Sequence, residues 1–372
     1  MISSTSLTQD LIRFDTVNPP GNEAPCARFL ARILEAAGFE TGLIPMGDNR
    51  ESLIARIGGV AGKLPLAFTG HTDVVPLGAL PWRADPFGGA IADGRIYGRG
   101  SSDMKSGVAA FVSAAVKLAP RLEGTPGVVL VITADEELGT AGARHMREQG
   151  VLPAAGALIV GEPTGNALLA GHKGTFWVEA TARGVTAHGS APEEGVNAVL
   201  KAARAALALS ALDFTAQTHP VLGPPTLNVG WMHGGINTNS VPDIARFCLD
   251  VRLVPGADPL ALIERFEQAA AGDVTFEVKG QNAPVWTDPA DPWIESLAAI
   301  VRSVTGSGGP IRGARFYTDA GQLKPGMGNP PTVILGPGEP GQAHQTDEYC
   351  LISRLEEGEA IYTQAIVQWG GL

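Results

Sequence analysis

Five short apolar runs of strand length constrain the fold of this chain more than any other feature of its sequence. The runs are SLIARI, LPLAFTG, GVVLVITA, ALIVGE and, much later, TVILGPG. Helical segments lie between several of them, and the clearest, NEAPCARFLARILEAAGFE, repeats apolar residues at three- and four-residue spacing before Gly38. Uninterrupted apolar strands that alternate with helices are typical of a largely parallel sheet covered on both faces. The pattern predicts an α/β fold.

Residues 174–283 show a different pattern. TFWVEATARG, PTLNVGWM, IARFCLDVRLV and VTFEVKG have the character of strands, and two helical segments separate them in the order βαββαβ. That order is the one of a ferredoxin-like unit. The α/β pattern then resumes with the helical segment DPWIESLAAIVRSVTG. We therefore predict one α/β domain built from residues 1–173 plus 284–372, with a smaller domain at 174–283 inserted between its halves.

Composition excludes several classes of protein. The formal net charge is −11 and no block of Lys and Arg occurs, whereas a nucleic-acid partner would call for a basic stripe. No apolar run reaches transmembrane length, and the N-terminal segment does not resemble a secretory signal. The three cysteines are scattered without a CxxC pair, which excludes a thiolate zinc site and a disulfide framework. We expect a soluble cytoplasmic protein with no membrane and no nucleic-acid partner.

Polar clusters follow the predicted strands at the points where the strands end. GHTD ends the strand LPLAF, the run Asp135-Glu136-Glu137 ends GVVLVITA, Glu162 follows ALIV, and His344 follows TVILGPG. In open α/β sheets, ligands bind outside the carboxyl ends of the strands. These four clusters therefore map to one rim of the sheet. Asp103 adds a fifth, in a Gly-rich loop just before a predicted helix.

The residue types at this rim indicate a metal site. Adjacent carboxylates repel one another and are costly to desolvate, so a cation would explain them. Imidazole nitrogens and carboxylate oxygens are both zinc ligands. The surplus of carboxylates favours two metal ions, roughly 3.5–4 Å apart. Because consecutive side chains at a strand end point in different directions, one glutamate could bind metal while its neighbour handles a proton.

Each of these signals has a structural alternative. A run of three acids in a loop is more often a solvated turn than a site. Asp73 lies two residues after His71 and could orient a metal-bound imidazole, or it could cap a turn or helix. The other histidines without acidic partners are interpreted as surface or satisfied core residues: His145, His172, His219 and His233. GPGEPG matches GxGxxG formally, but its two prolines and its position near the chain end exclude a nucleotide-binding unit.

Taken in order, seven motifs of this chain resemble a known family. They are GHTDVVP, GRGSSDMKSG, TADEELG, GEPTG, TAHGSAPEEGVNA, GGINTNSVPD and LGPGEPGQAHQTDEY. They are similar to those of the di-zinc amidohydrolases, the group of acetylornithine deacetylase, succinyl-diaminopimelate desuccinylase, aminoacylase and carboxypeptidase G. The resemblance spans nearly the whole chain. It implies that the α/β domain is catalytic and that the insert is the dimerisation or lid domain.

The resemblance also implies a role for each matching position. It implies a first zinc site formed by His71, Asp103 and Glu162, with Asp103 bridging both metals, and a second completed by Glu137 and His344. Cobalt could substitute for zinc. Glu136 matches the general base, Asp73 the acid behind His71, and the peptide bond after Asp103 is expected to be cis.

Three positions in the insert are implied to act on the substrate. His188 matches a residue that stabilises the oxyanion from the partner subunit of a homodimer, although without the family it would be interpreted as structural. Asn239 and Arg252 match positions that bind the substrate carboxylate. A guanidinium suits that task, but an Arg in a strand is often only part of a solvated face.

The function implied is hydrolysis of the amide bond of an N-acyl amino acid, by attack of a metal-bridged hydroxide with Glu136 as general base. The motifs FYTDAGQL and LGPGEPGQAHQTDEY look closer to acetylornithine deacetylase than to the desuccinylase. Two alternatives remain: a dipeptidase or carboxypeptidase G-like peptidase acting on short peptides, and a metal-binding relative without catalysis. The presence of Glu136 beside all five ligands argues against the second.

Overall fold

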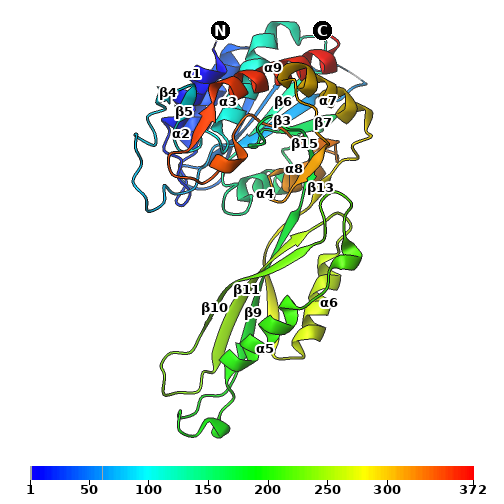
Figure 1. Cartoon of the computed structure of the whole chain (residues 1–372). Helices are drawn as coiled ribbons and strands as arrows, with labels where there is room; N and C mark the ends of the chain where they lie inside the picture. The colour runs from blue at the N-terminus through cyan, green and yellow to red at the C-terminus, as the bar shows by residue number, and fades with distance from the viewer. Residues whose placement is uncertain (1, 61) are drawn as a thin grey trace. The chain divides into compact units, whose positions relative to one another are not determined.

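A computed structural model describes residues 2–60 and 62–372 of the chain and divides them into two compact units. The first unit comprises residues 2–172, 286–314 and 318–372. The second comprises residues 173–285 together with the short segment 315–317. Figure 1 shows both units with many of their helices and strands labelled. No helix in the described part of the chain is long and apolar enough to cross a membrane.

The first unit is built on a nine-stranded sheet. The strands along its main path, in spatial order, are β1 (Glu40–Pro45), β2 (Glu51–Ile57), β6 (Val128–Thr133), β3 (Leu66–His71), β7 (Ala157–Val160), β15 (Thr332–Ile334), β8 (Leu169–His172) and β13 (Val285–Trp286). The ninth strand, β14 (Arg312–Ala314), pairs with β8. The central strands β6, β3, β7 and β15 are parallel, and β1 and β2 extend one edge in antiparallel pairing. The predicted largely parallel sheet is confirmed.

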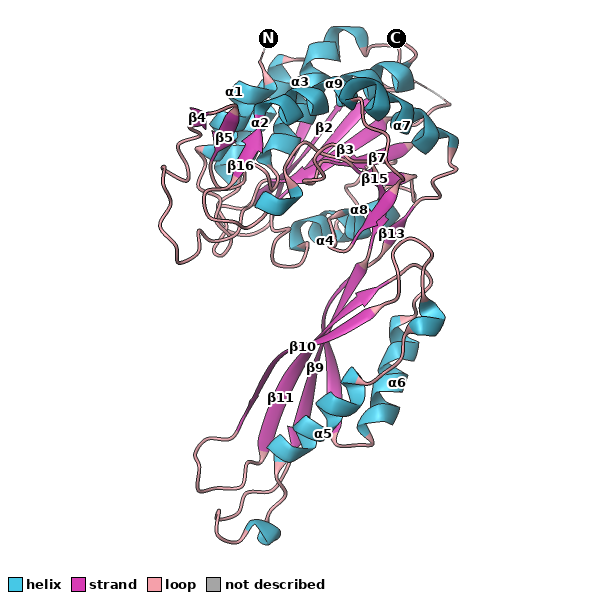
Figure 2. Cartoon of the chain, viewed as in Figure 1, coloured by secondary structure: helices cyan, strands magenta, loops and turns pink. Residues whose placement is uncertain are grey.

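Helices cover both faces of this sheet, with α3 and α9 on one face and α4 and α8 on the other in Figure 2. The helices of the first unit are α1 (Ser4–Ile12), α2 (Ala24–Ala36), α3 (Lys105–Leu118), α4 (Ala141–Glu148), α7 (Pro292–Thr305), α8 (Ala320–Gly326) and α9 (Ile352–Gly370). Helix α3 is buried along almost its whole length because it lies between the sheet and its neighbouring helices. Its Phe111 stacks on Phe68 of β3, and Tyr362 of α9 contacts the same ring edge-on.

A small second sheet joins two distant parts of the first unit. It contains β4 (Ile91–Ala92), β5 (Arg95–Tyr97) and β16 (Tyr349–Leu351) in the order β16-β5-β4. Strand β16 pairs with β5 in antiparallel register, with Tyr349 opposite Tyr97. This pairing brings the loop before β16, which carries His344, beside the loop after β5, which carries Asp103.

The second unit has the predicted ferredoxin-like order of elements. They are β9 (Gly174–Arg183), α5 (Ala198–Ser210), β10 (Thr226–Gly234), β11 (Ile244–Leu253), α6 (Pro259–Ala270) and β12 (Val274–Asn282). The four strands form one antiparallel sheet in the order β10-β11-β9-β12. Alternate residues of β9 and β11 are buried beneath α5 and α6, as expected for strands with one covered face.

Candidate active site

The carboxyl ends of the parallel strands bring the predicted acids and histidines together in the first unit. His71 is the last residue of β3 and pairs in register with Thr133, the last residue of β6. The acidic run therefore follows directly beside His71, and Glu162 follows the adjacent strand β7. The sheet register, more than any local motif, makes these segments neighbours.

Two groups of side chains in this region could each hold a metal ion, and Asp103 belongs to both. In the first group, Nε2 of His71 lies 3.4 Å from Oδ1 of Asp103 and 3.9 Å from Oε1 of Glu162. In the second group, Nε2 of His344 lies 3.5 Å from Oδ2 of Asp103 and 3.1 Å from Oε2 of Glu137. Within each group the ligand atoms lie within 4.8 Å of one another. The two oxygens of Asp103 thus face different groups.

The chemistry of these groups fits divalent metal ions. Nitrogen from histidine and oxygen from carboxylates are the donors that zinc takes in catalytic sites. Oε1 of Glu137 is buried and has no hydrogen-bond partner in the described part of the chain, which is costly for a carboxylate unless a ligand occupies that side. The peptide bond between Asp103 and Met104 is cis, as the resemblance implies.

The electrostatics of the site also favour a cation. Burial, together with the neighbouring charge of Asp103, raises the pKa of Glu162 well above its usual value. Burial alone would lower the pKa of His71, but the interaction with Asp103 and the negative charges of Glu162 and Asp73 raise it well above its usual value. For His344, the hydrogen bond with Glu137 raises the pKa of the imidazole. A bound cation would offset the repulsion that makes these carboxylates difficult to ionise.

Glu136 lies beside both groups and belongs to neither. Its side chain is almost completely buried, and burial raises its pKa well above the usual value, with the nearby charges of Glu162 and Asp319 adding to the effect. Its backbone N–H donates to the carboxylate of Asp73, but none of the described residues forms a hydrogen bond with the carboxylate of Glu136. A buried carboxyl group that is not tied down by hydrogen bonds and whose pKa is raised is suited to accept a proton and return it.

Asp73 is fully buried and connects His71 to the acidic run. Its Oδ1 accepts a hydrogen bond from the backbone N–H of Glu136 at 3.1 Å, and its Oδ2 accepts one from that of Glu137 at 3.2 Å. Nδ1 of His71 lies 2.9 Å from the backbone carbonyl oxygen of Asp73 but 3.5 Å from its carboxylate. The carboxylate of Asp73 therefore mainly fixes the turn that carries the two glutamates.

Two further residues support this turn and were not assigned from the sequence. The side-chain amide of Asn18 donates to Oδ2 of Asp73 at 2.9 Å and to Oδ1 of Asp135 at 2.6 Å. Nη1 of Arg50 lies 3.3 Å from Oδ2 of Asp135, so the first acid of the run anchors the turn from its other side. Both residues come from loops far away in sequence, and no local spacing links them to the acidic run.

Asp319 is a third residue that sequence analysis left without a role. It is 2% exposed and accepts a hydrogen bond from the hydroxyl of Thr133 at the end of β6. Burial raises its pKa to about 7. The available signal in the sequence is its position in FYTDAGQL, where Asp319 directly precedes the buried start of α8.

The second unit holds the remaining predicted residues, and it brings two of the three together. His188 pairs with Ser240 in an isolated β-bridge, and the backbone N–H of Gly189 donates to the carbonyl of Asn239 at 2.7 Å. His188 is exposed, with Nδ1 2.6 Å from the hydroxyl of Ser190. His188 and Asn239 therefore lie side by side on one loop cluster.

Arg252 lies at the opposite end of β11 from that cluster. It pairs across the sheet with Thr175 and Thr226, whereas the cluster adjoins the start of the strand at Ile244. Eight residues of extended strand separate the two ends by about 25 Å. The Arg252 guanidinium forms an ion pair with Asp250 at 2.9 Å and lies over the ring of Tyr317. Within one chain, this unit does not bring Arg252 together with Asn239.

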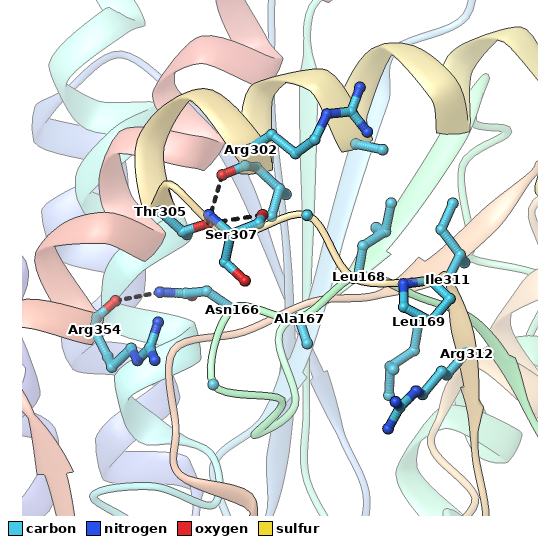
Figure 3. Close-up of a pocket in the computed structure, with 16 residues that line it drawn as sticks. Asn166, Ala167, Leu168, Leu169, Arg302, Thr305, Ser307, Ile311, Arg312 and Arg354 are labelled. Carbon is cyan, nitrogen blue, oxygen red and sulfur yellow. Dashed lines mark hydrogen bonds between the residues drawn. The ribbon is translucent and has the colours of Figure 1, made fainter.

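A cavity of about 340 Å³ lies elsewhere in the first unit, between residues 165–169 and the segment that follows α7. Its charged lining residues are Arg302, Arg312 and Arg354. In Figure 3 the side chain of Arg302 is directed away from the other two arginines, so the three do not converge on one point. None of the predicted site residues lines this cavity, and it is separate from the candidate site.

Comparison with known proteins identifies the family of this chain. The sequence profile of peptidase family M20/M25/M40 matches residues 67–368, which include all five predicted ligands. The chain belongs to this family. The resemblance inferred from the seven motifs is confirmed.

Relatives of this M20 protein carry two different names. It is 32% identical to a succinyl-diaminopimelate desuccinylase of Cereibacter sphaeroides, with 98% of each chain covered. It is 33% identical to an acetylornithine deacetylase of Myxococcus xanthus, with 97% of this chain and 96% of the relative covered. The fold is that of an M20 family metallo-carboxypeptidase from Sulfolobus solfataricus, with a TM-score of 0.83 and 20% identity over the full length of both chains.

These findings establish the class of the protein. It is an enzyme of a metal-dependent hydrolase family that acts on amide bonds, and its structure contains residue groups suited to metal ions.

His172, interpreted from the sequence as a core or surface residue, is fully buried with Nε2 3.0 Å from the hydroxyl of Thr318.

Proposed function

We propose that this M20 enzyme removes the acyl group from an N-acyl amino acid in the manner of acetylornithine deacetylase or succinyl-diaminopimelate desuccinylase. The observation that carries the proposal is the position of Asp103, whose two carboxylate oxygens face two separate ligand groups. Glu136 lies beside them without a ligand role. The names of relatives that match this chain over nearly its full length support the substrate class.

Two zinc ions, with cobalt as a substitute, are proposed as the cofactors. The first would be held by His71, Asp103 and Glu162, and the second by Asp103, Glu137 and His344. When bound, such ions polarise a carbonyl group and lower the pKa of water. Asp73 holds the turn of Glu136 and Glu137 in place for this arrangement.

Glu136 is proposed as the general base and then the general acid. It takes a proton from the attacking water as the new C–O bond forms at the amide carbonyl. It then delivers that proton to the nitrogen of the leaving amine as the C–N bond breaks. The immediate products are the carboxylic acid of the acyl group and the free amine of the amino acid. Transfer of the remaining water proton from the acid to the amine gives a carboxylate and an ammonium group, so atoms and protons balance without another reactant.

The two units are proposed to correspond to a catalytic domain at 1–173 plus 284–372 and an inserted dimerisation or lid domain at 174–283. Strand β10 lies at an edge of the second unit's sheet, and its residues Trp231 and Met232 are each 38% exposed. An exposed edge strand is a surface suited to pairing with a second copy. We propose a homodimer formed through this unit, in which His188 stabilises the oxyanion in the site of the partner subunit.

Asn239 and Arg252 are proposed to bind the carboxylate of the substrate. The separation of about 25 Å along β11 means that one chain cannot place both on the same carboxylate without help. Contribution of one of them from each subunit of the dimer is consistent with this separation.

A substrate panel tests the proposed function. Amine release would be measured with N-acetylornithine, N-succinyl-diaminopimelate, N-acetylmethionine and a glutamyl-capped folate analogue, using zinc-loaded and chelator-stripped enzyme. Zinc-dependent turnover of one of the first two supports the proposal and identifies the acyl group. Turnover of the folate analogue alone, or equal turnover after complete removal of metal, contradicts it.

A further inference from the structure

The buried ion pair of Arg99 and Glu348 lies next to the candidate metal groups and has no role in the reaction proposed above. Arg99 is 1% exposed and Glu348 is fully buried, and Nη1 of Arg99 lies 2.7 Å from Oε2 of Glu348. Ionising both groups in the interior is costly. The hydrogen bonds that offset this desolvation cost therefore indicate what the pair does in the structure.

Glu348 accepts four hydrogen bonds with its two carboxylate oxygens, and all four donors lie in the loop that carries Asp103. Oε2 accepts from Nη1 of Arg99 and from the backbone N–H of Gly100 at 2.9 Å. Oε1 accepts from the backbone N–H groups of Ser102 at 2.7 Å and Asp103 at 3.0 Å. The backbone of Asp103 is therefore fixed directly by this carboxylate.

Arg99 extends the same contacts to two other loops. Its Nη1 also donates to the carbonyl of Gln345, the residue after His344, at 3.2 Å. Its Nη2 donates to the carbonyl of Pro76, which follows the segment of His71 and Asp73, at 3.2 Å. The hydroxyl of Ser102 adds a bond to the carbonyl of Tyr349 at 2.7 Å.

We infer that the Arg99–Glu348 pair is a positioning device that sets the separation between Asp103 and His344 before metal binds. The carboxylates of the site repel one another, and the loop of Asp103 is the one that must approach both groups. The carboxylate of Glu348 accepts hydrogen bonds from the backbone N–H groups of this loop. It therefore opposes movement of Asp103 away from the two groups. Residues that orient metal ligands typically change metal affinity by about 10- to 100-fold when they are substituted.

The inference rests on the proposed function, because it takes the ligand set from there. The test is Glu348→Gln, which keeps the shape of the side chain but replaces one oxygen with an NH2 group. In either orientation of the glutamine amide, its NH2 group would face two of the four groups that donate to Glu348, and those two hydrogen bonds would be lost. Zinc affinities of the stripped protein would be measured by competition with a chromophoric chelator, with folding checked by circular dichroism.

We expect Glu348→Gln to weaken zinc binding by about 10- to 100-fold, with most of the loss in the group that contains His344. Saturating zinc should recover much of kcat, and KM should change little, because Glu348 does not face the substrate. Glu348→Asp keeps the charge but withdraws it by one methylene, and it should give an intermediate loss. If Glu348→Gln fails to fold, Glu348→Asp carries the test alone.

Tyr362→Phe is the matched control for a buried polar group in the same unit. Its hydroxyl donates to the backbone carbonyl of Leu335 and contacts none of the proposed ligands. This variant should lose stability but keep the zinc affinity of the wild type. Wild-type zinc affinities in both Glu348 variants would overturn the inference. Failure of the wild-type chain to bind zinc would instead overturn the proposed metal centre, so the two failures are distinguishable.

Discussion

Asp73→Asn separates two roles that the structure gives to one buried carboxylate. On sequence spacing, Asp73 could orient the His71 imidazole or cap a turn or helix, and the family resemblance favours the first role. The structure shows Nδ1 of His71 closer to the backbone carbonyl of Asp73, at 2.9 Å, than to its carboxylate, at 3.5 Å. The carboxylate instead accepts the backbone N–H groups of Glu136 and Glu137. Replacing Asp73 by Asn keeps the backbone carbonyl and disturbs the glutamates.

The size of the effect follows from the hydrogen bonds that are lost. With the NH2 group in the place of Oδ1, the bond from Glu136 is lost. With it in the place of Oδ2, the bonds from Glu137 and Asn18 are lost. A hydrogen bond to a charged group contributes about 1.5–3 kcal/mol, and an unsatisfied buried donor costs a similar amount. We therefore expect a loss of about 2–4 kcal/mol in the free energy of unfolding.

Metal titration distinguishes the two roles. Chelator competition on the stripped protein gives two zinc affinities, and His71→Ala and His344→Ala serve as references that assign them. Asp73→Asn should weaken the group that contains Glu137 by about tenfold or more and leave the group of His71 nearly unchanged. Weakened binding at the His71 group with an unchanged second group would refute the reasoning.

Three further predictions follow from the site. Glu136→Gln should bind both metals with wild-type affinity and lose about 10²- to 10⁴-fold in kcat; near-normal turnover would remove Glu136 as the base. Burial raises the pKa of Asp319 to about 7, so between about pH 4 and pH 7 the folded chain holds a proton that the unfolded chain has released. Stability therefore falls as pH rises through this window, and Asp319→Asn should remove a dependence of at most about 1.4 kcal/mol per pH unit, as measured by urea unfolding of the stripped protein. An unchanged slope would contradict the assignment. Finally, mixing the inactive variants His188→Ala and Glu136→Gln should restore roughly a quarter of wild-type activity if His188 acts across a symmetric dimer, whereas action within one chain restores none.

Much of the fold was predictable because the signals were periodic and local. The runs from LPLAFTG to TVILGPG became β3, β6, β7 and β15, since an apolar run flanked by polar residues has few alternatives to a buried strand. The βαββαβ order of the insert was predictable for the same reason. Helix α9 and the small sheet of β4, β5 and β16 were not predicted. Short strands of two or three residues carry little periodicity, and their pairing depends on contacts between distant segments.

The candidate site was predictable in its residue types but not in its support. His71, Glu162 and the acidic run could be placed on one rim because the carboxyl ends of parallel strands meet there. The sequence did not predict the supporting residues Asn18, Arg50 and Glu348, because each contacts backbone N–H groups or other side chains of the site and not a metal or substrate position. Nothing in their spacing marks such contacts.

The sequence alone determined the fold class, the family, and the acids and histidines that are proposed for the site, because periodicity and ordered motifs are properties of the chain itself. Only the tertiary structure decided how those groups are held. It showed that Asp103 faces two ligand groups, that the carboxylate of Asp73 binds the turn of the two glutamates, and that the Arg99–Glu348 pair joins three loops. These facts depend on distances between residues up to 249 positions apart in the chain, and such distances are fixed by packing and sheet register, which no local pattern encodes.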